Sequence, residues 1–463
     1  MFPLIFFSLI SRIYFGISYV EDIDSLRFAL SLIKFDVINL QPHFPVYPIF
    51  TWAAIILHSV SNSYLLTFSL IGAFSTIIIV ICVVKIIGSK LTMPLGFFVA
   101  LITFFNPLLW IMGVRYMPDL MGVAFVLLII LIFSNVKKVK CFGFIFCGLL
   151  FGVRLSYAPF IFPLLLSNYF SSDNKLRDVV LFFLGIAIWL IPLLLLTGFE
   201  DLFSAATRQT MGHFNEFGGT LSTEPDIFER GLATLRSIWA DGMGLYWPGR
   251  HWLTILSSFF LLTLFILWKK DNSNTSNQNR KINPSVIIGL VFYLVWIFLF
   301  QNVVHKSRHV LPILPFVCMG IGIVIAQQWG TGRFLNRFLV CGFLFCYSAI
   351  TLHIVNQHKT PTAISQVKDY LLSIHRHDLQ VVTTPLIKFY LKTHEIKANL
   401  IIAGNQNELD SLYCHYQERD QTNIKSFISI NNHVSGAVPK LKKTFFHNPY
   451  VNRLWPKLSV YEY

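Results

Sequence analysis

Apolar residues gather in long runs over the first 356 positions of this sequence, and short polar stretches separate the runs. A helix of about 20 apolar residues crosses the hydrocarbon core of a bilayer. Runs near that length predict about eleven transmembrane helices, at residues 2–19, 63–88, 92–112, 119–135, 141–153, 156–171, 178–198, 252–268, 284–301, 309–328 and 337–356. The first run carries Arg12 and lacks a cleavage site of small residues, so we expect it to be retained as a helix.

The runs at 141–153 and 156–171 are each short for a transmembrane helix. Basic residues flank the pair on both sides, namely Lys137, Lys138, Lys140, Lys175 and Arg177. Because basic residues favour the cytoplasmic side, both flanks belong on one side of the membrane. The pattern therefore predicts two short, partly buried helices that meet between Gly152 and Tyr157.

The same rule predicts a cytoplasmic N-terminus and places residues 20–62, residues 199–251 and the C-terminal part outside the cytoplasm. The loop at 199–251 is rich in Gly and Trp, and "GGT" and "DGMG" supply hinges, which is typical of a lid. The polar stretch 271–281 reads as a flexible linker.

After residue 356 the pattern changes to short apolar strands and amphipathic helices. "TAISQVKDYLLSIHRHD" has helical spacing, "LQVVTT" and "NLIIAG" read as buried strands, and "PLIKFYLKTH" between them reads as a helix. We therefore predict an α-helical polytopic membrane domain over 1–356 and a small extracytoplasmic α/β domain over 357–463, closed by "KLSVYEY".

The composition supports a membrane protein and excludes several function classes. Hydrophobic residues make up 54% of the 463 residues and charged residues only 13%, against about a quarter in soluble domains. The net charge of +14 is dispersed among apolar runs, so cytoplasmic loops explain it better than nucleic-acid binding. The sequence has no HExxH, no CxxC and no glycine-rich phosphate loop, which argues against dedicated zinc and against a nucleotide substrate.

Three clustered carboxylates, Glu21, Asp22 and Asp24, follow the first apolar run, at the start of "EDIDSLRFALSLIKFD". Apolar positions after them predict a helix that begins near Ser25, so Asp24 reads either as its N-cap or as a catalytic group. One cap requires one acid, and Glu21 and Asp22 lie beside it. Acids next to membrane helices are costly unless they are used, which keeps Asp22 and Asp24 as candidates.

A proline-rich stretch, "QPHFPVYP", comes next and blocks helix continuation until after Pro48. It fixes His43 and Tyr47 close to the predicted membrane surface. Either these two side chains bind a substrate, or Tyr47 belongs to an interfacial aromatic belt.

Cationic side chains recur at three outer helix ends, against the usual sign bias. They are Arg115 with Asp119 in "NPLLWIMGVRYMPD", Arg154 in "FGVRLSYAP", and Lys306 with Arg308 in "HKSRHVLPILP". An arginine at this depth either binds a ligand phosphate or extends to lipid headgroups. Asp119 reads either as a functional acid or as a partner of the helix dipole.

In this order and spacing, these segments resemble GT-C glycosyltransferases. The likeness is closest to the bacterial branch similar to protein O-mannosyltransferases and lipid A aminoarabinose transferases, and it covers most of the membrane region. The resemblance implies the GT-C fold, an outer C-terminal domain and a location in the bacterial inner membrane. It also implies transfer of a sugar from a polyprenyl-phosphate carrier to a lipid, glycan or protein outside the cytoplasm.

The resemblance also implies roles for individual residues. Asp24, four residues before Phe28, matches a catalytic Asp that lies four residues before an aromatic, while Ser25 replaces a second acid, for which Asp22 is a substitute. Asp119 matches a second acidic position. Arg308 matches a basic residue before an "LP" segment, where His309 replaces a Tyr. Some relatives require a divalent cation, so Mg or Mn stays open as a cofactor.

From the residues and the resemblance together we predict a membrane glycosyltransferase. Asp24 would activate the acceptor, and Arg154 and Arg308, with Arg115 or Lys306, would hold the phosphate of the donor. One rival is a transporter of lipid-linked sugars, which should show charges near the bilayer midplane and internal repeats. The other is an inactive assembly subunit that keeps the fold.

Overall fold

The computed structural model describes residues 2–134, 137–215, 218–272, 283–374, 379–419, 426–448, 453 and 455–463. Most of the predicted linker at 271–281 lies outside these ranges. The chain forms two compact units. The helical unit consists of residues 1–18 and 27–359, and the C-terminal unit consists of residues 19–26 and 360–463. The short segment 19–26 thus groups with the C-terminal residues although it lies between two parts of the helical unit in sequence.

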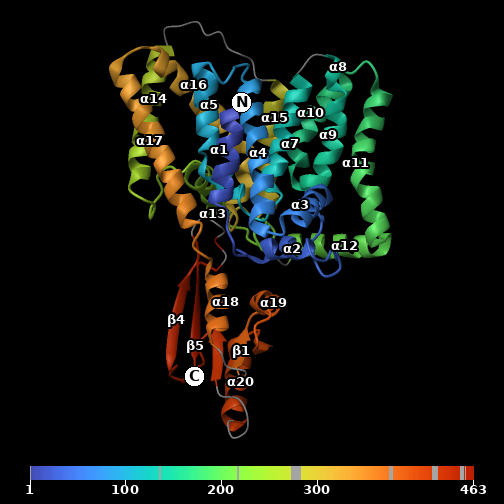
Figure 1. Cartoon of the computed structure of the whole chain (residues 1–463), viewed down its shortest axis with the longest axis vertical. Coiled ribbons are helices and arrows are strands. Elements are labelled where there is room, and N and C mark those ends of the chain that lie inside the picture. Colours follow the sequence, from blue (N-terminus) through green and yellow to red (C-terminus); the bar gives the residue numbers. More distant parts are fainter. Residues whose placement is uncertain are drawn as a thin grey trace. The chain divides into compact units, whose positions relative to one another are not determined.

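The helical unit is built from apolar helices that run alongside one another (Figure 1). The helices of the predicted spans are α1 (Phe2–Tyr14), α4 (Tyr64–Ile86), α5 (Pro94–Phe104), α6 (Pro107–Met112), α7 (Asp119–Ser134), α9 (Phe142–Arg154), α10 (Ala158–Phe170), α11 (Lys175–Thr197), α14 (Leu253–Asn272), α15 (Pro284–Phe300), α16 (Leu314–Gly330) and α17 (Phe334–Gln357). Two shorter elements lie beside them, α8 (Lys137–Lys140) and the 3₁₀ helix η3 (Ser307–Ile313).

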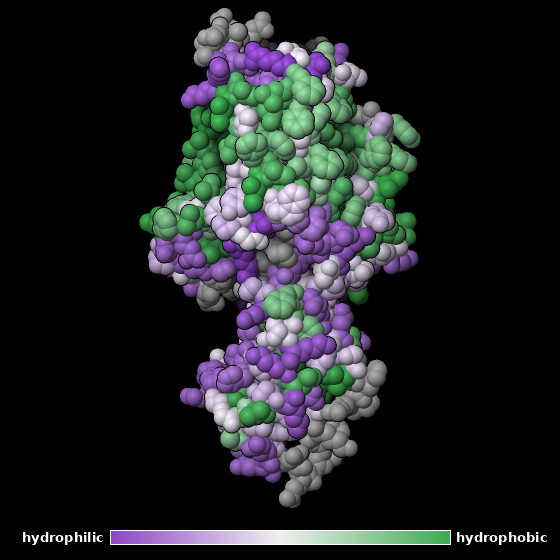
Figure 2. Space-filling model, turned by 90° about the vertical axis from the view of Figure 1, so that its left-hand side faces the viewer, coloured by the Kyte–Doolittle hydropathy of each residue, from purple (hydrophilic) through white to green (hydrophobic). Residues whose placement is uncertain are grey.

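The apolar helices make the chain an integral membrane protein. Among the described residues, six helical stretches are long and apolar enough to cross a bilayer, and five shorter apolar helices of 10–17 residues accompany them. Figure 2 shows an apolar band on the visible face of the helical unit, with hydrophilic residues at both of its ends. The number of membrane crossings and the side on which each terminus lies stay predictions.

The predicted span at 92–112 is two helices, α5 and α6, because the chain breaks at Asn106. The Asn106 side chain accepts a hydrogen bond from the Leu109 amide at 3.0 Å and so caps α6, and Pro107 suits the first helical position. Its amide nitrogen donates to the Tyr347 hydroxyl of α17 at 3.2 Å. The buried Asn106 side chain thus caps α6 at the break between the two helices, and its hydrogen bond to α17 holds that side chain in place.

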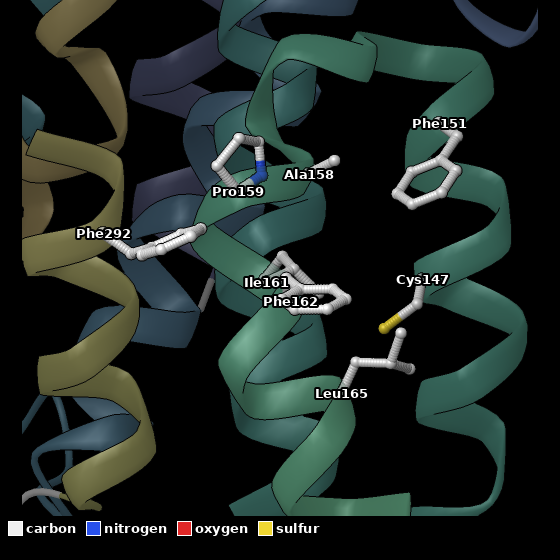
Figure 3. Close-up of a pocket in the computed structure, with 8 residues that line it drawn as sticks. All are labelled: Cys147, Phe151, Ala158, Pro159, Ile161, Phe162, Leu165 and Phe292. Carbon is white, nitrogen blue, oxygen red and sulfur yellow. The ribbon is translucent and has the colours of Figure 1, made fainter. Parts of the chain in front are cut away.

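The prediction of two short helices between 141 and 171 agrees with the structure. α9 ends at Arg154, whose backbone angles (φ −157°, ψ 87°) leave the helical region, and α10 begins at Ala158 after the 3₁₀ turn η1 (Leu155–Tyr157). Cys147 of α9 and Leu165 of α10 line the same pocket (Figure 3). One straight helix would separate them by about 27 Å, so the chain folds back.

The two stretches predicted as outer loops are largely helical. Residues 20–62 contain α2 (Ile23–Ser31) and α3 (Pro48–Ser61). Helix formation resumes at Pro48 itself and not after it, because proline suits the first position of a helix. Residues 199–251 contain α12 (Phe199–Asn215), α13 (Ile227–Arg236) and a π-helix, η2 (Ser237–Gly242). α3 and α12 lie at the end of the helical unit opposite α8, and α12 runs across the direction of α11 (Figure 1).

The C-terminal unit contains a five-stranded mixed sheet with strand order β2-β1-β3-β5-β4. Its elements are α18 (Ala363–Ser373), β1 (Leu379–Thr383), α19 (Pro385–Thr393), β2 (Asn399–Ile402), α20 (Gln406–Arg419), β3 (Ser426–Ile430), β4 (Leu441–Phe446) and β5 (Lys457–Glu462). β1 pairs in parallel with β2 and β3, while β5 pairs antiparallel with β3 and β4. The sequence predicted β1, α19, β2 and β5, and it missed α20, β3 and β4.

Replacing Gly148 by Ala should destabilise the contact between α9 and α11. A Cβ at Gly148 would overlap the backbone oxygen of Phe182, and such overpacking costs about 1–3 kcal/mol. Gly320 of α16 has open space around its Cβ position and serves as the matched control. Thermal unfolding of the purified protein in detergent should show a lower midpoint for Gly148→Ala and an unchanged midpoint for Gly320→Ala. Equal midpoints for the two variants would contradict the close approach.

Candidate functional site

Two arginines of the helical unit converge on the carboxylate of Asp119. The Nη2 of Arg154, at the end of α9, lies 2.9 Å from the Asp119 Oδ1, and the Nε of Arg308, in η3, lies 4.0 Å from the same oxygen. Asp119 begins α7 and is fully buried, while the two arginines are 5% and 7% exposed. Three helix ends that are distant in sequence therefore form one buried cluster of charges.

Tyrosines surround this cluster. The Arg154 guanidinium lies 5.2 Å from the ring centre of Tyr47 and 5.8 Å from that of Tyr157. The Tyr157 hydroxyl donates to the backbone oxygen of Asp119 at 3.3 Å. The ring of Tyr293, from α15, packs edge-on against Tyr157 with centroids 5.8 Å apart. Cation–π contacts and the ion pair together fix the plane of the Arg154 side chain.

The buried cluster keeps hydrogen-bonding capacity that the described residues do not use. Neither carboxylate oxygen of Asp119 makes a hydrogen bond of good geometry there, although the Arg154 nitrogen is close, and the same holds for the Nε of Arg154. Buried donors and acceptors are nearly always satisfied in folded proteins. Unused donors beside a carboxylate are typical of a place where a polar ligand completes the network.

Tyr47 is held in an unusual backbone conformation. Val46 and Tyr47 both adopt positive φ angles, 68° and 49°, which L-residues and above all β-branched ones avoid. Such strain is retained where the surroundings fix it, and it gathers at functional sites. His43 lies beside Tyr47, with ring centroids 5.4 Å apart, and both rings pack against Phe28 of α2. The predicted pair His43 and Tyr47 therefore does lie together, and Tyr47 joins the arginine cluster.

The other two predicted cations, Arg115 and Lys306, come just before α7 and η3 in the sequence. Arg115 is buried between α6 and α7, and its Nη1 approaches the Met112 sulfur at 3.7 Å. Lys306 precedes η3 directly and is half-buried. The sulfur of Met117, two residues after Arg115, lies 2.8 Å from the Nη1 of Arg308. The segment that carries Arg115 therefore reaches the cluster through Met117.

Asp22, and not Asp24, caps helix α2. The helix begins at Ile23, and the Asp22 Oδ1 accepts a hydrogen bond from the Ser25 amide at 2.8 Å. The reading of Asp24 as an N-cap is therefore wrong, because Asp24 already lies inside the first turn and is half-buried. A structural duty thus occupies Asp22. Both acids belong to segment 19–26 of the C-terminal unit.

The sequence analysis missed two residues that lie near the arginine cluster of the helical unit. Tyr293 was hidden in an apolar run, where a lone hydroxyl is the sole signal; it donates to the backbone oxygen of His309 at 2.9 Å. Asp241 of η2 accepts hydrogen bonds from Ser307, next to Arg308, and from Arg250. The motif "DGMG" was interpreted as a hinge, but its aspartate anchors the segment that carries Arg308.

Arg230 ties the predicted lid to the end of α15. The side chain is almost fully buried and donates to the backbone oxygens of Gly219, Phe298 and Gln301 at 2.6–3.0 Å. This contact fastens one part of the 199–251 stretch to the helices. The lid function itself stays a prediction.

An apolar pocket of about 240 Å³ lies between α9, α10 and α15 (Figure 3). Its lining is Cys147, Phe151, Ala158, Pro159, Ile161, Phe162, Leu165 and Phe292. The pocket adjoins the cluster along the chain, because Phe151 lies three residues before Arg154 and Ala158 directly follows Tyr157.

The cluster does not fit a divalent cation. In the ranges that the structure describes, no group of three His, Cys, Asp or Glu side chains could hold a metal ion. Asp119 faces two arginines, and their charges would repel Mg or Mn.

The apolar helices, the C-terminal sheet and the overall order of elements define an integral membrane protein with the GT-C fold. The fold is that of ArnT from Cupriavidus metallidurans, of which two solved structures are similar. The structure bound to undecaprenyl phosphate has a TM-score of 0.52 and 10% sequence identity, over 99% of this chain and 97% of that one. The apo structure has a TM-score of 0.50 and 9% identity, over 100% and 96%. No protein-family model and no curated protein matches the sequence.

Proposed function

We propose that this protein transfers a monosaccharide from a polyprenyl-phosphate carrier to an acceptor outside the cytoplasm. The observation that carries the proposal is the buried cluster of Arg154, Arg308 and Asp119, with hydrogen-bonding capacity left for a ligand. A planar guanidinium binds phosphate oxygens bidentately. The proposal draws further support from the fold, which is shared with a protein whose structure holds undecaprenyl phosphate.

The proposed reaction is a displacement at the anomeric carbon of the sugar. Asp24 takes the proton of the acceptor hydroxyl, and the oxygen forms a bond to the anomeric carbon. The bond between that carbon and the phosphate oxygen breaks, and polyprenyl phosphate leaves with the electron pair. Arg154 and Arg308 stabilise the negative charge that develops on the phosphate, while Arg115 and Lys306 add positive potential. The role of Asp24 comes from the family resemblance.

The apolar pocket supports a lipid donor. Its wall is formed by aliphatic and aromatic side chains with one thiol, which suits an isoprenoid chain and not a sugar. We assign the isoprenoid units nearest the phosphate to this pocket, because α9 carries both Cys147 and Phe151 of the pocket lining and, at its end, Arg154.

Purified full-length protein should release polyprenyl phosphate from a labelled polyprenyl-phosphate monosaccharide and pass the sugar to an acceptor in a lipid extract. Thin-layer chromatography of the label measures this. A labelled nucleotide sugar is the control donor and should give no transfer, because the sequence lacks a glycine-rich phosphate loop. Translocation of the intact lipid across liposomes without cleavage would instead identify a transporter. Neither cleavage nor translocation would indicate an assembly subunit.

A further inference from the structure

Two buried hydroxyls of the C-terminal unit hold the segment that carries Asp24. The Tyr390 hydroxyl, from α19, donates to the backbone oxygen of Val20 at 2.6 Å. The Thr362 hydroxyl donates to the backbone oxygen of Glu21 at 2.8 Å. Tyr390 and Thr362 are both fully buried, so neither bond is exchanged readily for water.

The two carbonyls that these hydroxyls bind lie just before the hydrogen-bond ladder of α2. The hydrogen-bond ladder of α2 starts at the Asp22 oxygen, which accepts from the Leu26 amide at 2.9 Å. The oxygens of Val20 and Glu21 come before that point and need donors from elsewhere. With successive carbonyls fixed, the peptide planes that lead into α2 are fixed as well. The direction in which the first turn of α2 presents Asp24 depends on them.

Thr362 shows that this contact is specific. It is the residue before α18, where a threonine ordinarily caps the helix with its side chain, yet its hydroxyl makes no cap hydrogen bond. The hydroxyl is used for Glu21 instead. Tyr390 is equally suited as a donor, because a tyrosine hydroxyl is protonated at neutral pH and burial raises its pKa further. The ring of His394 packs against Tyr390 at a tilt of 31°, with centroids 4.4 Å apart, and holds the tyrosine in place.

We propose that Tyr390 and Thr362 are positioning residues, through which the C-terminal unit sets the orientation of Asp24. The proposal rests on the proposed transfer reaction for its catalytic consequence, but the hold on residues 19–26 is a property of the structure that can be measured separately. It gives the outer domain a role in the chemistry of the enzyme in addition to any role in acceptor binding.

The test compares Tyr390→Phe and Thr362→Val with two controls in the full-length protein. Thr362→Ser keeps the hydroxyl. Tyr463→Phe removes a buried hydroxyl of the same unit that accepts from the Val434 amide at 2.7 Å, away from segment 19–26. Because one hydrogen bond is worth about 1 kcal/mol, each test variant should lower kcat about five- to tenfold and leave the KM for the donor within about twofold. The two controls should keep the kcat and the donor KM of the wild type.

Hydrogen exchange followed by mass spectrometry supplies the readout that does not depend on activity. Peptides covering residues 19–31 should exchange faster in Tyr390→Phe and Thr362→Val than in the two controls. Unchanged exchange would overturn the proposal, and so would faster exchange with kcat unaltered. If the wild type transfers no sugar, the proposed function has failed, and the exchange rates still decide whether the two hydroxyls order the segment.

Discussion

Asp24→Asn should abolish sugar transfer while the protein still folds and inserts into the membrane. Asn keeps the size and polarity of the side chain but cannot accept the proton of the acceptor hydroxyl. Removing a general base costs about 10²–10⁴-fold in rate, so kcat should fall by that factor. The measurement is release of polyprenyl phosphate, together with the thermal unfolding midpoint, which should stay unchanged.

Asp22→Asn is the matched partner of this variant, because it makes the same chemical change two residues away. Asp22 caps α2, and Asn caps a helix about as well as Asp does, so activity should stay within about threefold of the wild type. Asp22→Ala removes the cap and should lower stability by about 1 kcal/mol. If Asp22→Asn were inactive and Asp24→Asn active, the catalytic role would move to Asp22. Equal activity in the wild type, Asp22→Asn and Asp24→Asn would show that neither acid acts in the mechanism.

Asp119→Leu should destabilise the helical unit strongly. It leaves the buried guanidinium of Arg154, 5% exposed, without its carboxylate partner. Breaking a buried ion pair in this way costs about 3–5 kcal/mol. The double variant Asp119→Leu with Arg154→Leu removes both charges and should recover part of that loss. Thermal unfolding in detergent measures both effects.

Binding separates the structural from the functional role of the cluster. Arg154→Leu and the double variant should bind polyprenyl phosphate at least about tenfold more weakly, because a charged hydrogen bond contributes about 1.5–3 kcal/mol. The control pair is Arg177 with Asp178, which has the same 2.9 Å separation but a half-exposed arginine. Its removal should cost little stability, because solvent screens the exposed arginine, and should leave binding intact. Normal binding by the double variant would contradict a phosphate site at Arg154.

Much of the fold could be predicted from the sequence, because burial in a bilayer demands long apolar runs that are visible without any structure. α4, α7, α11 and α17 begin and end within a few residues of the predicted spans. The break at Asn106 escaped prediction because hydropathy does not register a polar residue whose partner, Tyr347, lies on a distant helix. In the C-terminal unit, polar residues on the surface of α20 and β4 concealed those elements from the apolar pattern.

The candidate site, like the fold, was predictable from the sequence only in part. The sequence alone determined that this is a membrane protein with cations at three helix ends, acids after the first helix and a separate α/β domain, since these properties are local. The tertiary structure decided that Arg154 and Arg308 share Asp119, that Tyr293 and Asp241 join them, and that Asp22 serves as a cap. It also decided that residues 19–26 belong with the C-terminal unit. Each of these depends on which distant segments pack together, and packing is set by shape and pairing over the whole chain.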